Sequence, residues 1–253
     1  MARQNFAEVV QSDSLDVSRE FFNLATLVYQ GGFHEVMESH FSLMPFKGLA
    51  IDLDDFDRRN NFNFFAYKTA TLDDLLSFSE YVYNFGVNIR GLYFLQEAED
   101  ASRICSYIEA VVAAAEHQLF LDRSGLYIAV PVDGWTRAAV ESADGGVSAE
   151  LLKYRYRGYE GDLRVKASIL ANLAKELEPR RGDLKQLAGN ATSDLFRGFN
   201  RWNIRHNNLD PATDHYEEEF ASLPDDEKEA RYDALYSLCC ASFLLLEYKD
   251  KSR

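Results

Sequence analysis

Apolar residues near the start of the chain recur every three or four positions, which is the spacing of one face of an α-helix. The pattern is carried by Val17, Phe21, Leu24 and Val28. Gly31 and Gly32 interrupt this stretch, because glycine is a poor helix former and readily adopts turn conformations. The sequence therefore predicts two helices within 13–44, the second beginning near Phe33.

Four segments have the alternating or aromatic-rich patterns that are typical of strands. They are 48–56 (GLAIDLDDF), 61–68 (NFNFFAYK), 87–95 (VNIRGLYFL) and 126–135 (LYIAVPVDGW). Helical patterns lie between them, at 71–85 with Thr71 as the expected N-cap, and at 97–121. The first part of the chain is therefore predicted to mix helices and strands.

The segment 141–150 (ESADGGVSAE) is small, polar and glycine-rich, which favours a linker. Beyond it the pattern predicts helices and no strand. These helices are expected at 162–179, 182–206 and 222–251, with a break near Gly189. We expect an α+β, mainly α fold, with an N-terminal mixed α/β domain at 1–145 and a helical bundle at 146–253.

The composition indicates a folded globular protein, because hydrophobic residues make up 47% of its 253 residues. The net charge of −14 argues against whole-surface binding to nucleic acid or to an anionic membrane. The charge is uneven, however. Residues 151–207 hold 12 Lys/Arg and 6 Asp/Glu, a net of +6, which leaves −20 for the remainder. A basic band in an acidic protein indicates a local anion site, although uneven surface charge gives the same pattern.

The cysteines and the apolar runs indicate in which cellular compartment the protein is expected. Cys105, Cys239 and Cys240 are odd in number and form no disulfide framework, which fits a reducing cytosol. The N-terminal residues lack the apolar core of a signal peptide. The longest apolar run, Leu238–Leu246, is too short to span a membrane and favours a buried helix. We therefore expect a cytoplasmic protein without a membrane partner.

Metal and cofactor motifs are weak. The chain has no phosphate-binding glycine loop, and His34 and His40 are too far apart in sequence to share a helical face as zinc ligands do. If 48–56 is a strand, Asp52 and Asp54 point the same way, as a divalent-metal site requires. Most acidic runs of this kind are solvated edges or turns, so we expect no resident metal and no cofactor.

The segment 153–159 (KYRYRGY) interleaves cations with aromatic rings, a composition that suits nucleic-acid binding. An amphipathic segment with its tyrosines packed inward would have the same composition. The candidate nucleic-acid contacts in the basic band are Lys153, Arg155, Arg157, Arg180 and Arg181.

The segment 199–211 (FNRWNIRHNNLDP) contains residue types that act on phosphodiesters. The guanidinium of Arg201 matches phosphate oxygens, and the imidazole of His206 titrates near neutrality and can act as a base. On an ideal helix these side chains lie about 140° apart, so they converge only if the helix ends between them. In the alternative interpretation the helix continues and His206 is a core residue. It would then share an apolar stripe with Phe199, Trp202 and Leu209.

This region resembles the HEPN superfamily, in particular the C-terminal module of prokaryotic abortive-infection proteins. The resemblance covers roughly residues 150–250. It is carried by FNRWNIRHNNLD (199–210) and EARYDALYSLCCASFLLLEY (229–248). It implies a helical bundle, a homodimer with two motifs facing one cleft, and metal-independent RNase activity with Arg201 and His206 as the motif pair. Trp202 stands where the family has a polar residue, and some members are inactive binding modules.

The leading hypothesis is therefore an RNA-cleaving or RNA-binding effector of prokaryotic defence against phage, with an antitoxin or another defence protein as a partner. Arg201 and His206 would be catalytic, Asn203 and Asn207 would hold the geometry, and Arg205 would guide the RNA backbone. The alternatives are a catalytically inactive HEPN-like assembly module and a metal-dependent enzyme built on the acidic segment 52–57.

Overall fold

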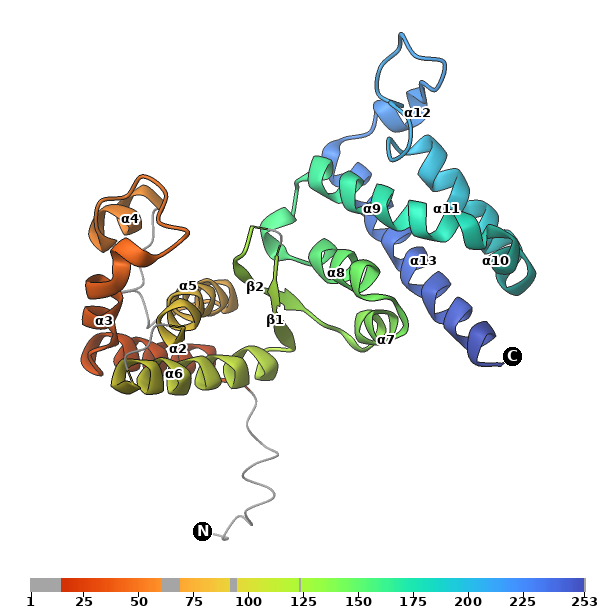
Figure 1. Ribbon diagram of the computed structural model, residues 1–253. Coiled ribbons are helices and arrows are strands. Elements are labelled where there is room, and N and C mark those ends of the chain that lie inside the picture. The colour runs from red at the N-terminus through yellow and green to blue at the C-terminus, as the bar shows by residue number, and fades with distance from the viewer. Residues whose placement is uncertain (1–14, 61–68, 92–94, 123, 253) are drawn as a thin grey trace, which may run out of the picture. The chain divides into compact units, whose positions relative to one another are not determined.

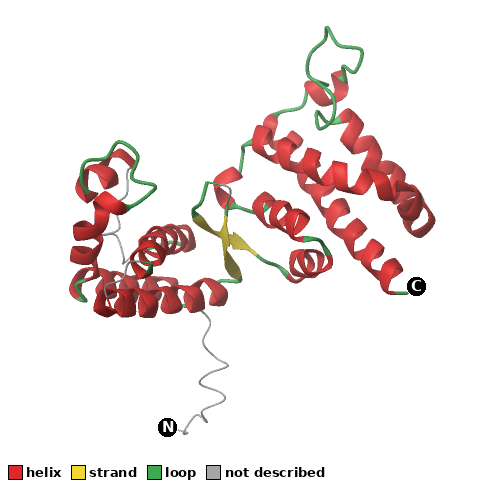
Figure 2. Ribbon diagram, in the orientation of Figure 1, coloured by secondary structure: helices red, strands yellow, loops and turns green. Residues whose placement is uncertain are grey.

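The computed structural model describes residues 15–60, 69–91, 95–122 and 124–252. The chain divides into two compact units, Met1–Ala129 and Val130–Arg253, and each is described by itself. Both are built mainly from helices, and the described residues contain one sheet, of two strands (Figure 2). The predicted mainly helical character is thus confirmed.

The first unit is a helical assembly (Figure 1). Its helices are α2 (Val17–Ala25), the π-helical turn η1 (Thr26–Gln30), α3 (Phe33–His40), η2 (Phe41–Leu43), α4 (Leu53–Asn60), α5 (Leu72–Arg90) and α6 (Leu95–Ala114). Strand β1 (His117–Leu121) follows and pairs with β2 (Tyr127–Pro131). The predicted break at the glycine pair is confirmed, because α3 begins after Gly32 at a φ of 82°.

Helix α5 forms the centre of this unit and packs against α6. Thr71 caps α5 as expected, in a capping box with Asp74. Gly86 allows the close approach of the two helices, because a Cβ atom there would lie 2.6 Å from the Sγ atom of Cys105. Both Gly86 and Cys105 are buried, so the close contact lies inside the core.

Two of the strand predictions in the first unit are wrong. The segment 48–56 enters α4, because the carboxylate of Asp52 accepts a hydrogen bond from the backbone N–H of Asp55 at 2.7 Å and so begins a helix. In the segment 87–95, α5 continues to Arg90 and α6 begins at Leu95, while 92–94 lie outside the described residues. The strand predicted at 61–68 lies outside the described residues.

The helix predicted at 97–121 is also corrected. Helix α6 ends at Ala114, and Glu116 has a φ of 57°, which breaks the helix and leads into β1. The strand predicted at 126–135 is confirmed in its central part as β2. Within its described residues, the first unit therefore contains less strand than the sequence pattern predicts.

The second unit is a helical bundle after the end of β2. Its elements are α7 (Gly134–Ser142), α8 (Gly145–Tyr154), η4 (Arg157–Tyr159), α9 (Leu163–Leu177), η5 (Glu178–Arg180), α10 (Arg181–Ala188), α11 (Asn190–Arg201), α12 (Glu218–Ala221) and α13 (Asp225–Lys251). The predicted break is confirmed, since Gly189 separates α10 from α11 with a φ of 51°.

The long helix α13 packs against α7, α9, α10 and α11 (Figure 1). Its apolar run is largely core, because Cys239, Cys240, Phe243 and Leu246 are buried against side chains of this unit. This burial explains why the run is so apolar without requiring a second chain to cover it.

The linker predicted at 141–150 is wrong. These residues include the end of α7 and the first turns of α8, where Val147 is buried in the core of the second unit. The division between the units instead lies between Ala129 and Val130, inside β2. The small residues of 141–150 serve a tight connection between two helices.

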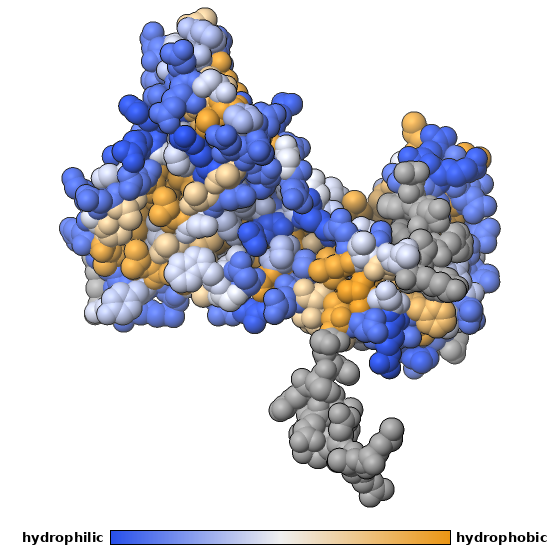
Figure 3. Space-filling view, turned by 180° about the vertical axis from the view of Figure 1, so that it is seen from behind, coloured by the Kyte–Doolittle hydropathy of each residue, from blue (hydrophilic) through white to orange (hydrophobic). Residues whose placement is uncertain are grey.

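The face shown in Figure 3 is mostly hydrophilic, with apolar residues gathered in patches on each unit. Among the helices that the structure describes, none combines the length and the apolar character that crossing a membrane requires.

Candidate nucleic-acid interface

The segment that carries the predicted motif begins where α11 ends. Arg201 is the last residue of α11, and Trp202 follows as its C-cap. Asn203 has a φ of 55°, a left-handed conformation that asparagine tolerates better than most residues. The helix therefore stops within the motif, and the chain continues into a loop, 202–217, that leads to α12.

Asn208 holds this loop together. Its side chain is buried, accepts a hydrogen bond from the N–H of Asn203 at 2.9 Å and donates one to the carbonyl oxygen of His215. Its backbone N–H donates to the Oδ1 atom of Asn203 at 3.1 Å, and its carbonyl oxygen accepts from the N–H of Glu217 at 3.0 Å. Asn208 was not predicted as a site residue. The only signal in the sequence was the asparagine-rich composition, which is typical of such local side chain–backbone bonds.

Asn203, which the sequence analysis expected to support the catalytic pair, makes hydrogen bonds within the loop through its N–H and its Oδ1 atom. Its side chain also lies within hydrogen-bonding reach of the hydroxyl of Tyr232 on α13. Burial raises the pKa of Tyr232 to about 12, so this hydroxyl is protonated at neutral pH. The start of the loop is thereby joined to the bundle.

A pocket of about 300 Å³ lies beside the end of α11, and we call it the arginine pocket. It is lined by Arg197, Arg201, Trp202, Glu217, Glu219, Phe220 and Arg231. Arg201 pairs with Glu217 at 3.3 Å, and Arg231 pairs with Glu219 at 3.1 Å. Three guanidinium groups therefore face two carboxylates across the pocket, and that of Arg197 pairs with Asp194 outside the lining at 2.5 Å.

Trp202 is positioned by its neighbours in this pocket. Gly198 leaves room for its indole ring, because a Cβ atom there would lie 3.2 Å from ring atoms. The guanidinium of Arg231 lies 5.6 Å from the centre of the indole ring, within the range of a cation–π contact. Trp202 thus contacts one of the three arginines of the pocket.

His206 does not line the arginine pocket. Its ring stacks on that of His215, with ring centres 4.0 Å apart and an interplanar angle of 22°. His206 is also not the core residue of the alternative interpretation. That interpretation needs a helix through Leu209, whereas α11 ends at Arg201 and Leu209 is 41% exposed.

The predicted supporting residues Arg205 and Asn207 differ in their surroundings. Arg205 pairs with Glu178, and its guanidinium lies over the ring of Phe199 at 5.3 Å. These contacts direct it toward the bundle. The side chain of Asn207 is exposed, and its carbonyl oxygen accepts a hydrogen bond from the hydroxyl of Thr213 at 2.8 Å.

The predicted contacts in 153–159 lie at the end of α8 and in η4. The ammonium of Lys153 lies 5.8 Å from the ring centre of Tyr159, and the guanidinium of Arg157 lies 5.6 Å from that of Tyr156. Arg155 pairs with Asp133 at 3.5 Å. Arg155 and Arg157 line a second pocket, separate from the arginine pocket.

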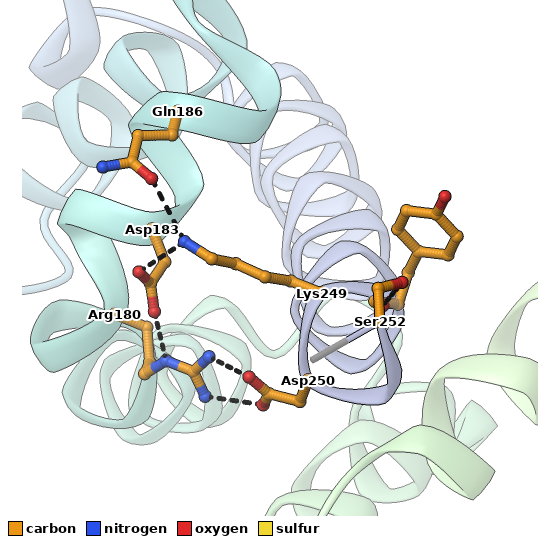
Figure 4. A network of polar contacts seen from close by, with 7 residues as sticks. Arg180, Asp183, Gln186, Lys249, Asp250 and Ser252 are labelled. Carbon is orange, nitrogen blue, oxygen red and sulfur yellow. Dashed lines mark hydrogen bonds and ion pairs between the residues drawn. The ribbon is translucent and has the colours of Figure 1, made fainter.

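Arg180 and Arg181 lie where α9 leads into α10. Arg180 contacts Asp183 and Asp250 in a network near the end of α13, which also includes Lys249 (Figure 4). Arg181 lies with its guanidinium 4.6 Å from the ring centre of Phe196. The structure therefore does not bring the five predicted nucleic-acid contacts into one track.

The acidic segment 52–57 does not form a metal site in the part of the chain that the structure describes, where no three His, Cys, Asp or Glu side chains are placed to hold an ion. Asp52 caps the start of α4, Asp55 pairs with Arg59 at 2.7 Å, and Asp57 accepts a hydrogen bond from the hydroxyl of Tyr81 at 2.8 Å. Burial raises the pKa of Asp57. These carboxylates point to different partners because they lie on a helix.

No protein-family model matches the chain, and neither a curated protein nor a solved structure matches it.

Proposed function

We propose that the second unit binds RNA through the arginine pocket. The observation that carries this proposal is the convergence of Arg197, Arg201 and Arg231 on one cavity. Guanidinium groups match phosphate oxygens, and each offers more donors than its single carboxylate partner uses. A phosphate can therefore be bound without breaking every existing ion pair.

The resemblance to HEPN proteins supports the biological part of the proposal. By this resemblance the protein would be an effector of abortive-infection or toxin–antitoxin defence, acting as a homodimer with an antitoxin-like partner. The arginine of the family motif, Arg201, is the residue that lines the pocket.

The catalytic form of the proposal adds RNA cleavage by Arg201 and His206. It requires His206 to leave its stack with His215 and to reach a phosphate bound by Arg201. Cleavage would need no metal and would leave 2′,3′-cyclic phosphate ends, because the imidazole would take the 2′-hydroxyl proton.

A second candidate function is a catalytically inactive assembly module of the same family. It is favoured by the placement of His206, which is stacked on His215 and does not line the arginine pocket. In this form the bundle contacts RNA or a protein partner and performs no chemistry.

The test is binding of a fluorescent single-stranded RNA to wild type and to the variants Arg201→Ala and Arg231→Ala. Each variant should weaken binding. Each should also make the slope of the log binding constant against log salt concentration less steep by about 1, the value for one lost phosphate contact. Arg164→Ala is the matched control, since Arg164 is an exposed arginine of the same basic band that does not line the pocket.

If Arg164→Ala weakens RNA binding equally, the effect comes from the overall charge of the basic band, and binding at the arginine pocket is rejected. The same RNA, incubated with wild type in the presence of EDTA, separates the two forms of the proposal. Cleavage that is lost in His206→Ala supports the RNase, whereas intact RNA bound by wild type supports the inactive module.

A further inference from the structure

The second pocket of the second unit contains a buried lysine, and we call it the lysine pocket. It has a volume of about 450 Å³, which lies in the range of small-molecule sites. It is lined by Pro131, Tyr154, Arg155, Tyr156, Arg157, Glu160, Lys166, Asp226, Glu229, Ala230 and Asp233. None of these residues lines the arginine pocket.

Lys166 is a buried cation inside this pocket. The residue is 7% exposed. Its ammonium lies 2.6 Å from a carboxylate oxygen of Glu229, 2.9 Å from one of Asp233 and 5.0 Å from the ring centre of Tyr154. The pocket thus already holds one alkylammonium group between carboxylates and an aromatic face, using an ammonium that belongs to the chain itself.

The floor of the pocket is fixed by further hydrogen bonds. The hydroxyl of Tyr154 donates to the Oδ1 atom of Asp233 at 2.8 Å, and the N–H of Gly161 donates to the Oε1 atom of Glu229 at 2.9 Å. Burial and the neighbouring Asp233 raise the pKa of Tyr154, so its hydroxyl remains a donor. The carboxylates are therefore held in position before any ligand arrives.

The lining carries an excess of negative charge. Four carboxylates, from Glu160, Asp226, Glu229 and Asp233, face three cations, of which Lys166 is paired within the pocket and Arg155 pairs with Asp133. Within the described residues, Glu160 and Asp226 form no ion pair. This charge favours a cationic ligand and disfavours a phosphate.

The carboxylates on α13 are also regularly spaced. Asp226, Glu229 and Asp233 lie three and four residues apart on one face, which corresponds to rises of about 4.5 and 6 Å along the axis. Linear polyamines carry ammonium groups separated by three or four methylene groups, a matching repeat. Ala230 lies between these carboxylates and leaves space beside the helix.

We propose that the lysine pocket binds a linear aliphatic polyamine, whose ammonium groups pair with the carboxylates of α13 beside Lys166. This site is distinct from the arginine pocket, so the inference does not depend on RNA binding.

The experiment is calorimetric titration of the full-length protein with spermidine at constant ionic strength. The double variant Glu160→Gln/Asp226→Asn should bind spermidine about tenfold more weakly, because two carboxylate partners are lost. The matched control is Asp225→Asn/Glu227→Gln, which makes the same change of charge on residues outside the pocket. It should weaken binding by less than about twofold.

A third variant tests the cavity without changing its charge. Ala230→Leu places a larger side chain in the pocket and should also weaken binding by about tenfold. Magnesium at matched ionic strength should not displace spermidine. The proposal is overturned if wild type does not bind, if the two double variants weaken equally, if Ala230→Leu binds like wild type, or if magnesium displaces the ligand.

Discussion

Arg180 and Asp250 form a two-pronged ion pair in which two guanidinium nitrogens lie 3.1 and 2.9 Å from the two carboxylate oxygens (Figure 4). The Nε atom of the same arginine donates to Asp183 at 3.0 Å, and Asp183 also accepts from Lys249 at 2.7 Å. This network joins the start of α10 to the end of α13, two segments that are distant in sequence.

We expect Arg180→Ala to lower the free energy of unfolding by about 1 kcal/mol, because it removes one paired side chain from a connected network at the surface. Arg180→Lys should not restore the loss, since a lysine cannot form the two parallel hydrogen bonds. Urea unfolding of Arg180→Ala, Asp250→Ala and the double variant gives the coupling energy. Strictly additive losses would show that the pair contributes nothing as a pair.

The same network predicts a dependence of stability on pH. Hydrogen bonds from Lys249 and Arg180 hold the pKa of Asp183 below its usual range. A depressed pKa in the folded state stabilises the protein above the unfolded pKa of about 4, and the contribution is lost as the pH falls through the folded value. The urea midpoint of wild type should therefore fall on acidification below about pH 4, and that of Asp183→Asn should fall less steeply. Parallel curves would contradict this assignment.

Asn208→Ala should destabilise the second unit by about 1–3 kcal/mol, because it removes two hydrogen bonds that the buried Asn208 side chain makes to the backbone of Asn203 and His215. Asn207→Ala is the matched control and should be nearly neutral, since that side chain is exposed. Denaturant unfolding compares the two. If both variants unfold at the wild-type midpoint, the loop is not held by Asn208.

Gly86→Ala should destabilise the first unit by about 1–3 kcal/mol, because the added methyl group would collide with the Sγ atom of Cys105. The double variant Gly86→Ala/Cys105→Ala removes the colliding atom. It should therefore be less destabilised than the sum of the two single variants, as measured by urea unfolding. If the double variant loses as much unfolding free energy as the two single variants together, the strain does not come from the contact with the Sγ atom of Cys105.

Much of the helical content could be predicted from the sequence, because it rests on local signals. The spacing of Phe21 and Leu24 and the cap at Thr71 each act within a few residues. The strand at 48–56 was mispredicted for the same reason. The segment alternates apolar and polar residues where a short helix begins, with Asp52 as its cap. So short an alternation does not distinguish a strand from the start of a helix.

The candidate site could be predicted only in part. The sequence singles out Arg201 as a candidate catalytic residue, and in the structure Arg201 lines a cavity. Its neighbours Glu217 and Arg231 come from the far end of the loop and from α13, and no local pattern connects them. Their approach depends on the turn at Asn203 and on the bonds of Asn208 across the loop, which only the three-dimensional structure shows.

The buried cysteines give each unit its own chemical probe of opening. Cys105 lies in the core of the first unit, and Cys239 and Cys240 lie in that of the second. Burial raises the pKa of Cys105 and of Cys240 to about 11, so each thiol is protonated as well as shielded in the folded state. Alkylation therefore requires a unit to open, and the labelling rates of the two sets of thiols measure how often each unit does so.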